Sequence, residues 1–157
     1  MISGWRIADP EFSKNAAQMM SGEGAFRYGG RWNSKGVRVV YLGSSLAQAA
    51  MELLIHLGRA EVLNVYNKME VTFVDDLAEH ISIEDLPKNW AEPSMASSVQ
   101  VVGDDWIAKE SSVILQVPSA AIKGEYNYLL NPSHPLTAQV NFGPITPFNF
   151  DPRLIKD

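Results

Sequence analysis

The stretch Gly29-Gly30-Arg31-Trp32-Asn33 leads into the apolar run 37–42 and then into the pattern 46–57. The run is rich in β-branched residues, which predicts a buried strand. In the pattern, apolar residues recur three and four positions apart, which predicts a helix with a serine N-cap and a stop at Gly58. This order of loop, strand and helix predicts a site assembled from three elements.

The same signals predict the elements on either side of this unit. Strands are expected at 5–7, 62–74, 80–83, 112–117 and 145–150, and helices at 12–20 and 93–109. Four glycines make 21–30 a loop, 125–130 is a strand or a turn, and two prolines make 131–135 a loop. Because strands and helices mix without a regular βαβ order, the sequence predicts one α+β domain over 1–157.

The composition excludes several classes of function. The 157 residues carry a net charge of -5 and no long basic run, so direct binding to nucleic acid is not expected. Cysteine is absent, which removes disulfides, thiolate nucleophiles and thiolate metal sites. No apolar run approaches the ~20 residues that span a bilayer, so we expect a cytoplasmic protein without a membrane contact.

Arg31, Tyr41 and Glu52 carry side chains suited to a dinucleotide. An arginine holds a pyrophosphate, an aromatic ring stacks on a flat base, and a carboxylate stabilises positive charge developing on a sugar. Glu52 lies off the apolar stripe of its predicted helix, on the side of Gln48 and His56. Two interpretations of Glu52 stay open, a solvated helix-face residue and a residue that faces a cleft.

Other chemistries are weakly indicated. Glu52 and His56 are four residues apart, but two ligands are too few for a metal site, so no metal is expected. Ser119 and His134 lack both a GxSxG motif and an identifiable acidic partner, which disfavours a serine hydrolase. The sequence also lacks a Walker loop and a GxGxxG motif.

Several strings together resemble the RES domain, a family named for its arginine, glutamate and serine. These strings are Gly29–Val37, Val40–Leu42, Ala49–Glu52, Trp5–Ile7, Val117–Ser119, Asn127–Leu130, 131–135 and Phe150–Leu154. They occur in order over nearly the whole chain. The resemblance implies an α+β, ADP-ribosyltransferase-like fold of mixed, mainly antiparallel sheets with flanking helices.

The resemblance also implies a function. RES proteins are toxins of bacterial type II toxin–antitoxin pairs and are usually neutralised by an Xre-like, helix-turn-helix antitoxin. Their reported action is to degrade NAD+ by hydrolysis or phosphorolysis, with NAD+ as substrate and no cofactor required. Two alternatives stay open: ADP-ribosylation of a protein, and a non-enzymatic antitoxin-binding module. Nucleic-acid contact would then come from the antitoxin, and a homodimer within the complex stays open.

Carried over by the resemblance, the catalytic residues are Glu52, Arg31, Tyr41 and Ser119. Ionised Glu52 would hold the ribose 2′-hydroxyl. Arg31 would bind a phosphate or the nicotinamide-side ribose, and the Tyr41 ring would stack on nicotinamide. Ser119 would bond a hydroxyl or place another site residue. Three nearby serines are alternatives for this role: Ser111, Ser112 and Ser133.

Other residues are expected around this site. Arg6 is either a second phosphate ligand or a structural partner of a carboxylate. Arg27 and Tyr28 flank the glycine pair and would line the mouth of the site. Burial of Trp32 and turn hydrogen bonds of Asn33 would fix the loop itself.

Overall fold

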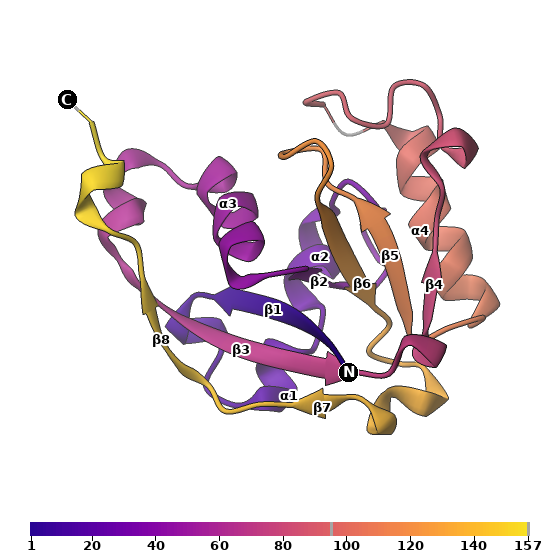
Figure 1. The fold of residues 1–157 in the computed structure, drawn as a ribbon, viewed down its shortest axis with the longest axis horizontal. Helices are drawn as coiled ribbons and strands as arrows, with labels where there is room; N and C mark the ends of the chain where they lie inside the picture. The colour runs from indigo at the N-terminus through magenta and orange to yellow at the C-terminus, as the bar shows by residue number, and fades with distance from the viewer. Residues whose placement is uncertain (95, 157) are drawn as a thin grey trace.

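A computed structural model describes residues 1–94 and 96–156 of the chain. Their strands form one eight-stranded sheet in the order β4-β5-β6-β2-β1-β3-β7, with β8 also pairing with β3 (Figure 1). All pairs within this described part are antiparallel except β4 with β5, which is parallel. The predicted α+β class and mainly antiparallel pairing are confirmed, with the strands joined in a single sheet.

The strands are β1 (Ile2–Ala8), β2 (Val40–Gly43), β3 (Val65–Phe73), β4 (Ala78–His80), β5 (Ile114–Pro118), β6 (Tyr126–Leu130), β7 (Asn141–Phe142) and β8 (Thr146–Asn149). The helices are α1 (Ala16–Met19), α2 (Glu23–Tyr28), α3 (Leu46–His56) and α4 (Ser97–Lys109). Short 3-10 turns occupy Pro10–Phe12, Arg59–Leu63, Asp75–Leu77, Ile83–Asp85, Pro135–Gln139 and Pro152–Leu154.

Most predicted elements are present, with shifted ends. The helix over 46–57 is confirmed, and 125–130 is the strand β6. The strand predicted at 80–83 lies two residues earlier, and the helix predicted over 93–109 begins at Ser97, with Met95 outside the described residues. Of the helix predicted over 12–20, only Ala16–Met19 is helical, because the Asn15 side chain caps the first turn there. The strand β7 was not predicted.

The prediction of a loop over 21–30 is wrong, because α2 lies inside it. Gly22 and Gly29 bound this helix with positive φ values of 70° and 73°. Glu23 and Arg27, four residues apart, form an ion pair of 2.8 Å along its surface. The glycines therefore terminate a short helix instead of extending a loop.

One face of the sheet carries both long helices. Strand pairing sets Trp5 opposite Gly43 and Gly43 opposite Asn127, so these three residues share that face. Over β1, α3 packs its apolar side against Trp5 and Ile7. Figure 1 shows α4 beside β4 and β5. Trp106 of α4 packs in a second cluster with Leu115 of β5 and Leu129 of β6. The opposite face is covered by Met19 of α1 and by Met20, which follows the helix; both side chains are buried.

Two glycines allow close approaches of backbone on the helix-covered face. A Cβ on Gly43 would lie 2.4 Å from the amide nitrogen of Ala49, so only glycine lets the first turn of α3 rest on the end of β2. A Cβ on Gly103 would lie 1.8 Å from the carbonyl oxygen of Trp32, so α4 contacts the arginine-containing loop backbone to backbone. These two contacts fix α3 and α4 relative to β2 and to residues 29–33.

Candidate active site

A polar cluster surrounds the carboxylate of Glu52. Its Oε1 atom accepts hydrogen bonds from Ser119 Oγ at 2.8 Å, Asn127 Nδ2 at 2.8 Å and Gln48 Nε2 at 3.1 Å. The four residues come from α3, the turn that follows β5 and the start of β6. Residues from three elements therefore converge on a single carboxylate oxygen.

The second carboxylate oxygen of Glu52, Oε2, has no hydrogen-bond partner among residues 1–94 and 96–156. Glu52 is half-buried, whereas its helix neighbour Gln48 is only 4% exposed. Of the two interpretations of Glu52 that the sequence left open, the solvated helix-face residue does not fit this environment. One carboxylate oxygen is thus held by three protein donors, and the other has no partner in this part of the chain.

Ser119 is the serine that contacts the glutamate. Its hydroxyl accepts hydrogen bonds from the backbone amides of Ala121 and Ile122 at 3.2 and 3.1 Å, and the residue is 2% exposed. Ser112 instead bonds the Trp106 indole and a backbone carbonyl. Exposed Ser111 and Ser133 have no bond to Glu52. Of the four serines considered, the structure brings only Ser119 to Glu52.

Tyr41 lies on the same face of the sheet as Asn127. It pairs with Leu129, so Asn127 is its diagonal neighbour on β6, about 7–8 Å away. The Tyr41 hydroxyl donates to Asn33 Oδ1 at 2.5 Å and accepts from the amide of Trp32 at 3.1 Å. Burial raises the pKa of Tyr41 well above its ordinary range. A neutral tyrosine therefore links the arginine-containing loop to the strand beside the Glu52 cluster.

Arg31 projects from this loop toward the segment that precedes α4. Its Nη1 atom donates to the carbonyl oxygens of Trp90 at 2.9 Å and Glu92 at 2.7 Å. Its Nε and Nη2 atoms bond no residue in the described part of the chain. Arg31 is half-buried and forms no direct bond to Glu52. The guanidinium is therefore anchored at one nitrogen and retains further donors for a ligand.

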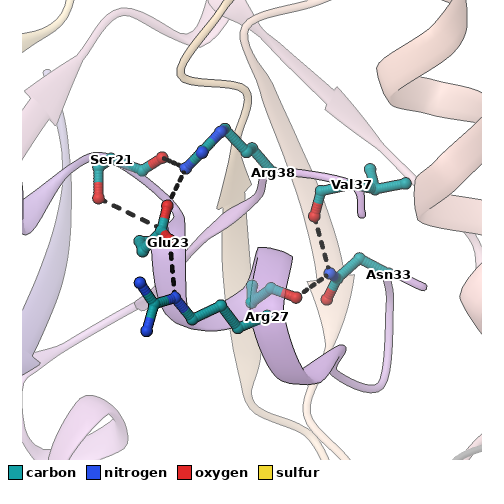
Figure 2. A network of polar contacts seen from close by, with 7 residues as sticks. Ser21, Glu23, Arg27, Asn33, Val37 and Arg38 are labelled. Atoms are coloured by element: carbon teal, nitrogen blue, oxygen red, sulfur yellow. Dashed lines mark hydrogen bonds and ion pairs between the residues drawn. The ribbon is translucent and has the colours of Figure 1, made fainter. Parts of the chain in front are cut away.

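Trp32 and Asn33 fix this loop, as the sequence predicted. Trp32 is 2% exposed, and Asn33 Nδ2 donates to the carbonyls of Ala25 at 2.9 Å and Val37 at 3.0 Å (Figure 2). From α4, Gln100 Nε2 donates to the carbonyls of Gly30 and Asn33. The conformation that presents Arg31 is thus determined by hydrogen bonds on both sides of the loop.

Arg27 and Tyr28 lie on α2, outside these contacts. Arg27 pairs with Glu23, which raises the pKa of the Arg27 guanidinium, and Glu23 also binds Arg38 at 2.6 Å (Figure 2). Tyr28 is 72% exposed. Neither residue contacts the Glu52 cluster, and both remain accessible at the surface beside the glycine pair.

Arg6 is not brought to the Glu52 cluster. It precedes Ile7 in β1, pairs with Met69 and lies on the sheet face opposite Trp5, where its Nε atom donates to the carbonyl of Met19 at 3.4 Å. Burial lowers the pKa of Arg6. No carboxylate in the described part of the chain pairs with it. Its contact is with the backbone of α1, which differs from both roles considered in the sequence.

Gln48 and Asn127 belong to the cluster but were not predicted as site residues. Gln48 lies one helical turn before Glu52, so the spacing signal was present in the sequence. Asn127 falls within one of the strings that carried the family resemblance. The sequence could not show that β5 and β6 cover this polar side of α3.

Two shallow hollows of about 410 and 360 Å³ lie elsewhere, beside the 131–135 loop, and both are lined by Arg38 and Ser133. Neither includes Glu52, Tyr41 or Arg31, and neither gathers a comparable set of converging polar groups. In residues 1–94 and 96–156, no three histidine or carboxylate side chains lie close enough to hold a metal ion. None of the helices described is long and apolar enough to cross a membrane.

The model of the RES domain matches residues 3–151, so the chain belongs to the RES-domain family. A relative named Toxin Res, from Yersinia enterocolitica, is 36% identical over 140 residues, which cover 88% of this chain and 91% of the relative. A relative named Prs ADP-ribosylating toxin, from a Sphingobium strain, is 36% identical over 157 aligned positions. The alignment covers 97% of this chain and 96% of the relative.

A solved structure supports the fold. The crystal structure of the Mycobacterium tuberculosis MbcT–MbcA toxin–antitoxin complex matches with a TM-score of 0.75 and 20% identity. The match covers 98% of this chain and 86% of the compared chain. The family assignment and the α+β fold predicted by the resemblance are therefore confirmed, and the class is that of RES-domain toxins.

Proposed function

We propose that this RES-domain protein is a toxin that degrades NAD+ by cleaving the bond between nicotinamide and ribose. The observation that carries the proposal is the environment of Glu52. Three donors hold Oε1, and Oε2 has no partner among the described residues. A carboxylate fixed in this way is suited to stabilise a cationic sugar.

The chemistry requires little beyond this carboxylate. The nicotinamide of NAD+ leaves as a neutral molecule, and the ribose carbon passes through an oxocarbenium-like state, as in glycoside cleavage. Oε2 of Glu52 accepts a hydrogen bond from the ribose 2′-hydroxyl and stabilises the positive charge on the ribose. Water or phosphate then attacks the same carbon, which yields ADP-ribose or its 1-phosphate.

Arg31 and Tyr41 supply the binding contacts in this proposal. The Nε and Nη2 donors of Arg31 bind a phosphate of the substrate, while Nη1 stays on the carbonyls of Trp90 and Glu92. The half-buried ring of Tyr41 provides a flat surface for nicotinamide between the loop and the Glu52 cluster. Ser119 orients Glu52 through its hydroxyl.

The test is to incubate the purified protein with NAD+ and to quantify free nicotinamide, with and without phosphate. We expect release of nicotinamide, and the phosphate dependence identifies the acceptor. Glu52→Gln removes the charge with little change of shape and is expected to lower the rate at least about 100-fold. Glu79→Gln, at an exposed position of β4, is the matched control. No nicotinamide release by the wild-type protein would refute the proposal.

A second function is ADP-ribosylation of a protein, which the name of the Sphingobium relative favours. The bond broken is the same, and a nucleophilic side chain of the target replaces water at the ribose carbon. NAD+ labelled in its adenylate distinguishes the two. Label transferred to a protein band supports the transferase, whereas label found only in small molecules supports degradation.

We also propose a cognate helix-turn-helix antitoxin of the Xre type as partner, since the matched solved structure is a toxin–antitoxin complex. Co-expression with the neighbouring reading frame should restore growth, and the molar mass of the purified complex reports whether the toxin is a homodimer in it. If Arg31→Ala and Glu52→Ala left toxicity unchanged, the chain would instead be a non-enzymatic binding module.

A further inference from the structure

We propose that Gln48 and Asn127 are positioning residues, which hold the Glu52 side chain so that Oε2 faces the substrate. This inference rests on the proposed NAD+ cleavage. It assigns neither residue a contact with NAD+, and both act through Glu52. The cluster that they complete joins α3 to β6 and to the turn after β5.

Gln48 lies at the centre of the cluster. Its Nε2 atom is within hydrogen-bond distance of Ser119 Oγ at 2.8 Å, Asn127 Oδ1 at 3.1 Å and Glu52 Oε1 at 3.1 Å. An amide nitrogen carries two hydrogens, so three acceptors share them. One side chain thus contacts every other member of the cluster, and its removal would loosen all of them.

Asn127 completes a closed set of bonds. Its Oδ1 atom accepts from Gln48 while its Nδ2 atom donates to Glu52 Oε1 at 2.8 Å. Because it extends from β6 within the sheet, its backbone is fixed by pairing with Gly43 and Val117. Glu52 is therefore tied both to its own helix, through Gln48, and to the sheet, through Asn127.

The burial of these amides points to a purpose beyond packing. Gln48 is 4% and Asn127 9% exposed, and burying an amide carries a desolvation penalty that an apolar side chain would avoid. Ala49, the neighbour of Gln48, shows that α3 buries apolar side chains elsewhere on its sheet-facing side. Within residues 1–94 and 96–156, the side-chain amides of Gln48 and Asn127 bond only Glu52, Ser119 and each other among side chains.

All three donors bind the same oxygen of Glu52, which makes this arrangement asymmetric. Rotation about the last side-chain bond would exchange Oε1 and Oε2 and would require all three bonds to re-form. With one donor removed, the carboxylate samples other orientations, and a misplacement of about 1 Å costs on the order of 100-fold in rate. The loss should appear in kcat, because neither amide binds the substrate.

The test compares Gln48→Leu with wild type in the nicotinamide-release assay. We expect kcat to fall about 10- to 100-fold with KM within about twofold. Gln139→Leu, at an exposed position outside the site, is the control and should match wild type. In a Glu52→Gln background, Gln48→Leu should lower kcat little further, because the effects of mutating residues that act as a unit are not additive. If Gln48→Leu acted only by disturbing the fold, its fold-reduction in kcat would multiply with that of Glu52→Gln.

Gln48→Glu is a second variant for the case that leucine prevents folding. It keeps the size of the side chain but places a second carboxylate against Glu52, and two adjacent carboxylates resist simultaneous ionisation. The acidic limb of the kcat profile should therefore move to higher pH, whereas Gln139→Glu should leave it unchanged. Asn127→Asp is expected to shift the limb in the same direction.

The outcomes separate this inference from the proposed function. If wild type releases nicotinamide and folded Gln48→Leu and Gln48→Glu keep its kcat and its pH profile, the positioning role is wrong and NAD+ cleavage stands. A rise in KM without a fall in kcat would also overturn it, since it would place Gln48 in substrate binding. If wild type releases no nicotinamide, both proposals fail.

Discussion

The hydroxyl of Ser119 donates to the Oε1 atom of Glu52 across 2.8 Å, and the two residues lie 67 positions apart in the chain. The backbone amides of Ala121 and Ile122 donate to the same hydroxyl, which leaves its hydrogen directed at the carboxylate. Glu52 and Ser119, which the resemblance named as site residues, therefore meet directly, while Arg31 lies on a separate loop and binds the carbonyls of Trp90 and Glu92.

Ser119→Ala should lower kcat for NAD+ cleavage by about 10-fold or more, because Glu52 loses one of its donors. The free energy of unfolding should fall by about 1 kcal/mol for the lost hydrogen bond. Ser112→Ala is the matched control, since Ser112 is also buried and bonded but lies outside the cluster. It should lose similar stability and retain kcat. Equal kcat values for the two variants would contradict the role of Ser119.

Tyr41→Phe should destabilise the arginine-containing loop. The variant leaves the amide of Trp32 without its acceptor, so we expect the free energy of unfolding to fall by about 1–3 kcal/mol at neutral pH. Chemical denaturation followed by tryptophan fluorescence measures this change. A variant as stable as wild type would show that the Tyr41 hydroxyl does not hold the loop.

The same pair of proteins tests the titration of Tyr41. Burial raises the pKa of Tyr41 in the folded protein above its ordinary value of 10.0. Above about pH 10, the unfolded chain releases the phenol proton while the folded protein retains it, so stability falls as pH rises. The phenylalanine side chain of the variant has no proton to release. The stability difference between wild type and Tyr41→Phe should therefore shrink above about pH 10, and a constant difference would contradict the raised pKa.

Gly43→Ala should displace α3 from the end of β2, because the added Cβ would lie 2.4 Å from the amide nitrogen of Ala49. Overpacking of this kind costs about 1–3 kcal/mol, and the shift of α3 should also reduce NAD+ turnover. Gly24→Ala is the control, since nothing lies within 4 Å of its added Cβ in α2. It should stabilise the protein by about 0.5–1 kcal/mol. Thermal unfolding and turnover measure both variants.

Arg31→Lys should weaken NAD+ binding, with KM raised about 10-fold, because lysine keeps the charge but loses the planar set of donors. The two carbonyls that Arg31 now binds would compete with the substrate for the lysine ammonium. Arg27→Lys, in an exposed pair with Glu23, should change KM little. If both variants had the same KM as wild type, Arg31 would have no part in substrate binding.

The sequence predicted those parts of the fold that depend on local pattern. The spacing of apolar residues predicts α3, because a helix with one buried side repeats every 3.6 residues. By contrast, the four glycines in or beside α2 predict a loop there, and the structure has a helix. The Glu23–Arg27 spacing and the placement of Gly22 and Gly29 at its two ends were the signals that could have identified it.

The candidate site was predicted only in part, for a reason that Gln48 illustrates. The helical pattern places Gln48 on the side away from the apolar stripe, which is typical of a solvated residue. In the structure, the turn after β5 and the strand β6 cover that side and supply polar partners. Such burial depends on pairing between distant segments, which no local pattern contains. For Arg6, by contrast, a local pattern does contain the answer. Side chains alternate along β1, so Arg6 lies on the sheet face opposite Trp5 and away from the Glu52 cluster.

The contact between Gly103 and Trp32 has a mechanical consequence. The carbonyl oxygen of Trp32 occupies the space that a side chain on Gly103 of α4 would take, so the loop and the helix are in direct backbone contact. Val101, on the outer side of α4, is 48% exposed and accessible to a partner. A partner that tilts α4 would therefore move the residue after Arg31 with it.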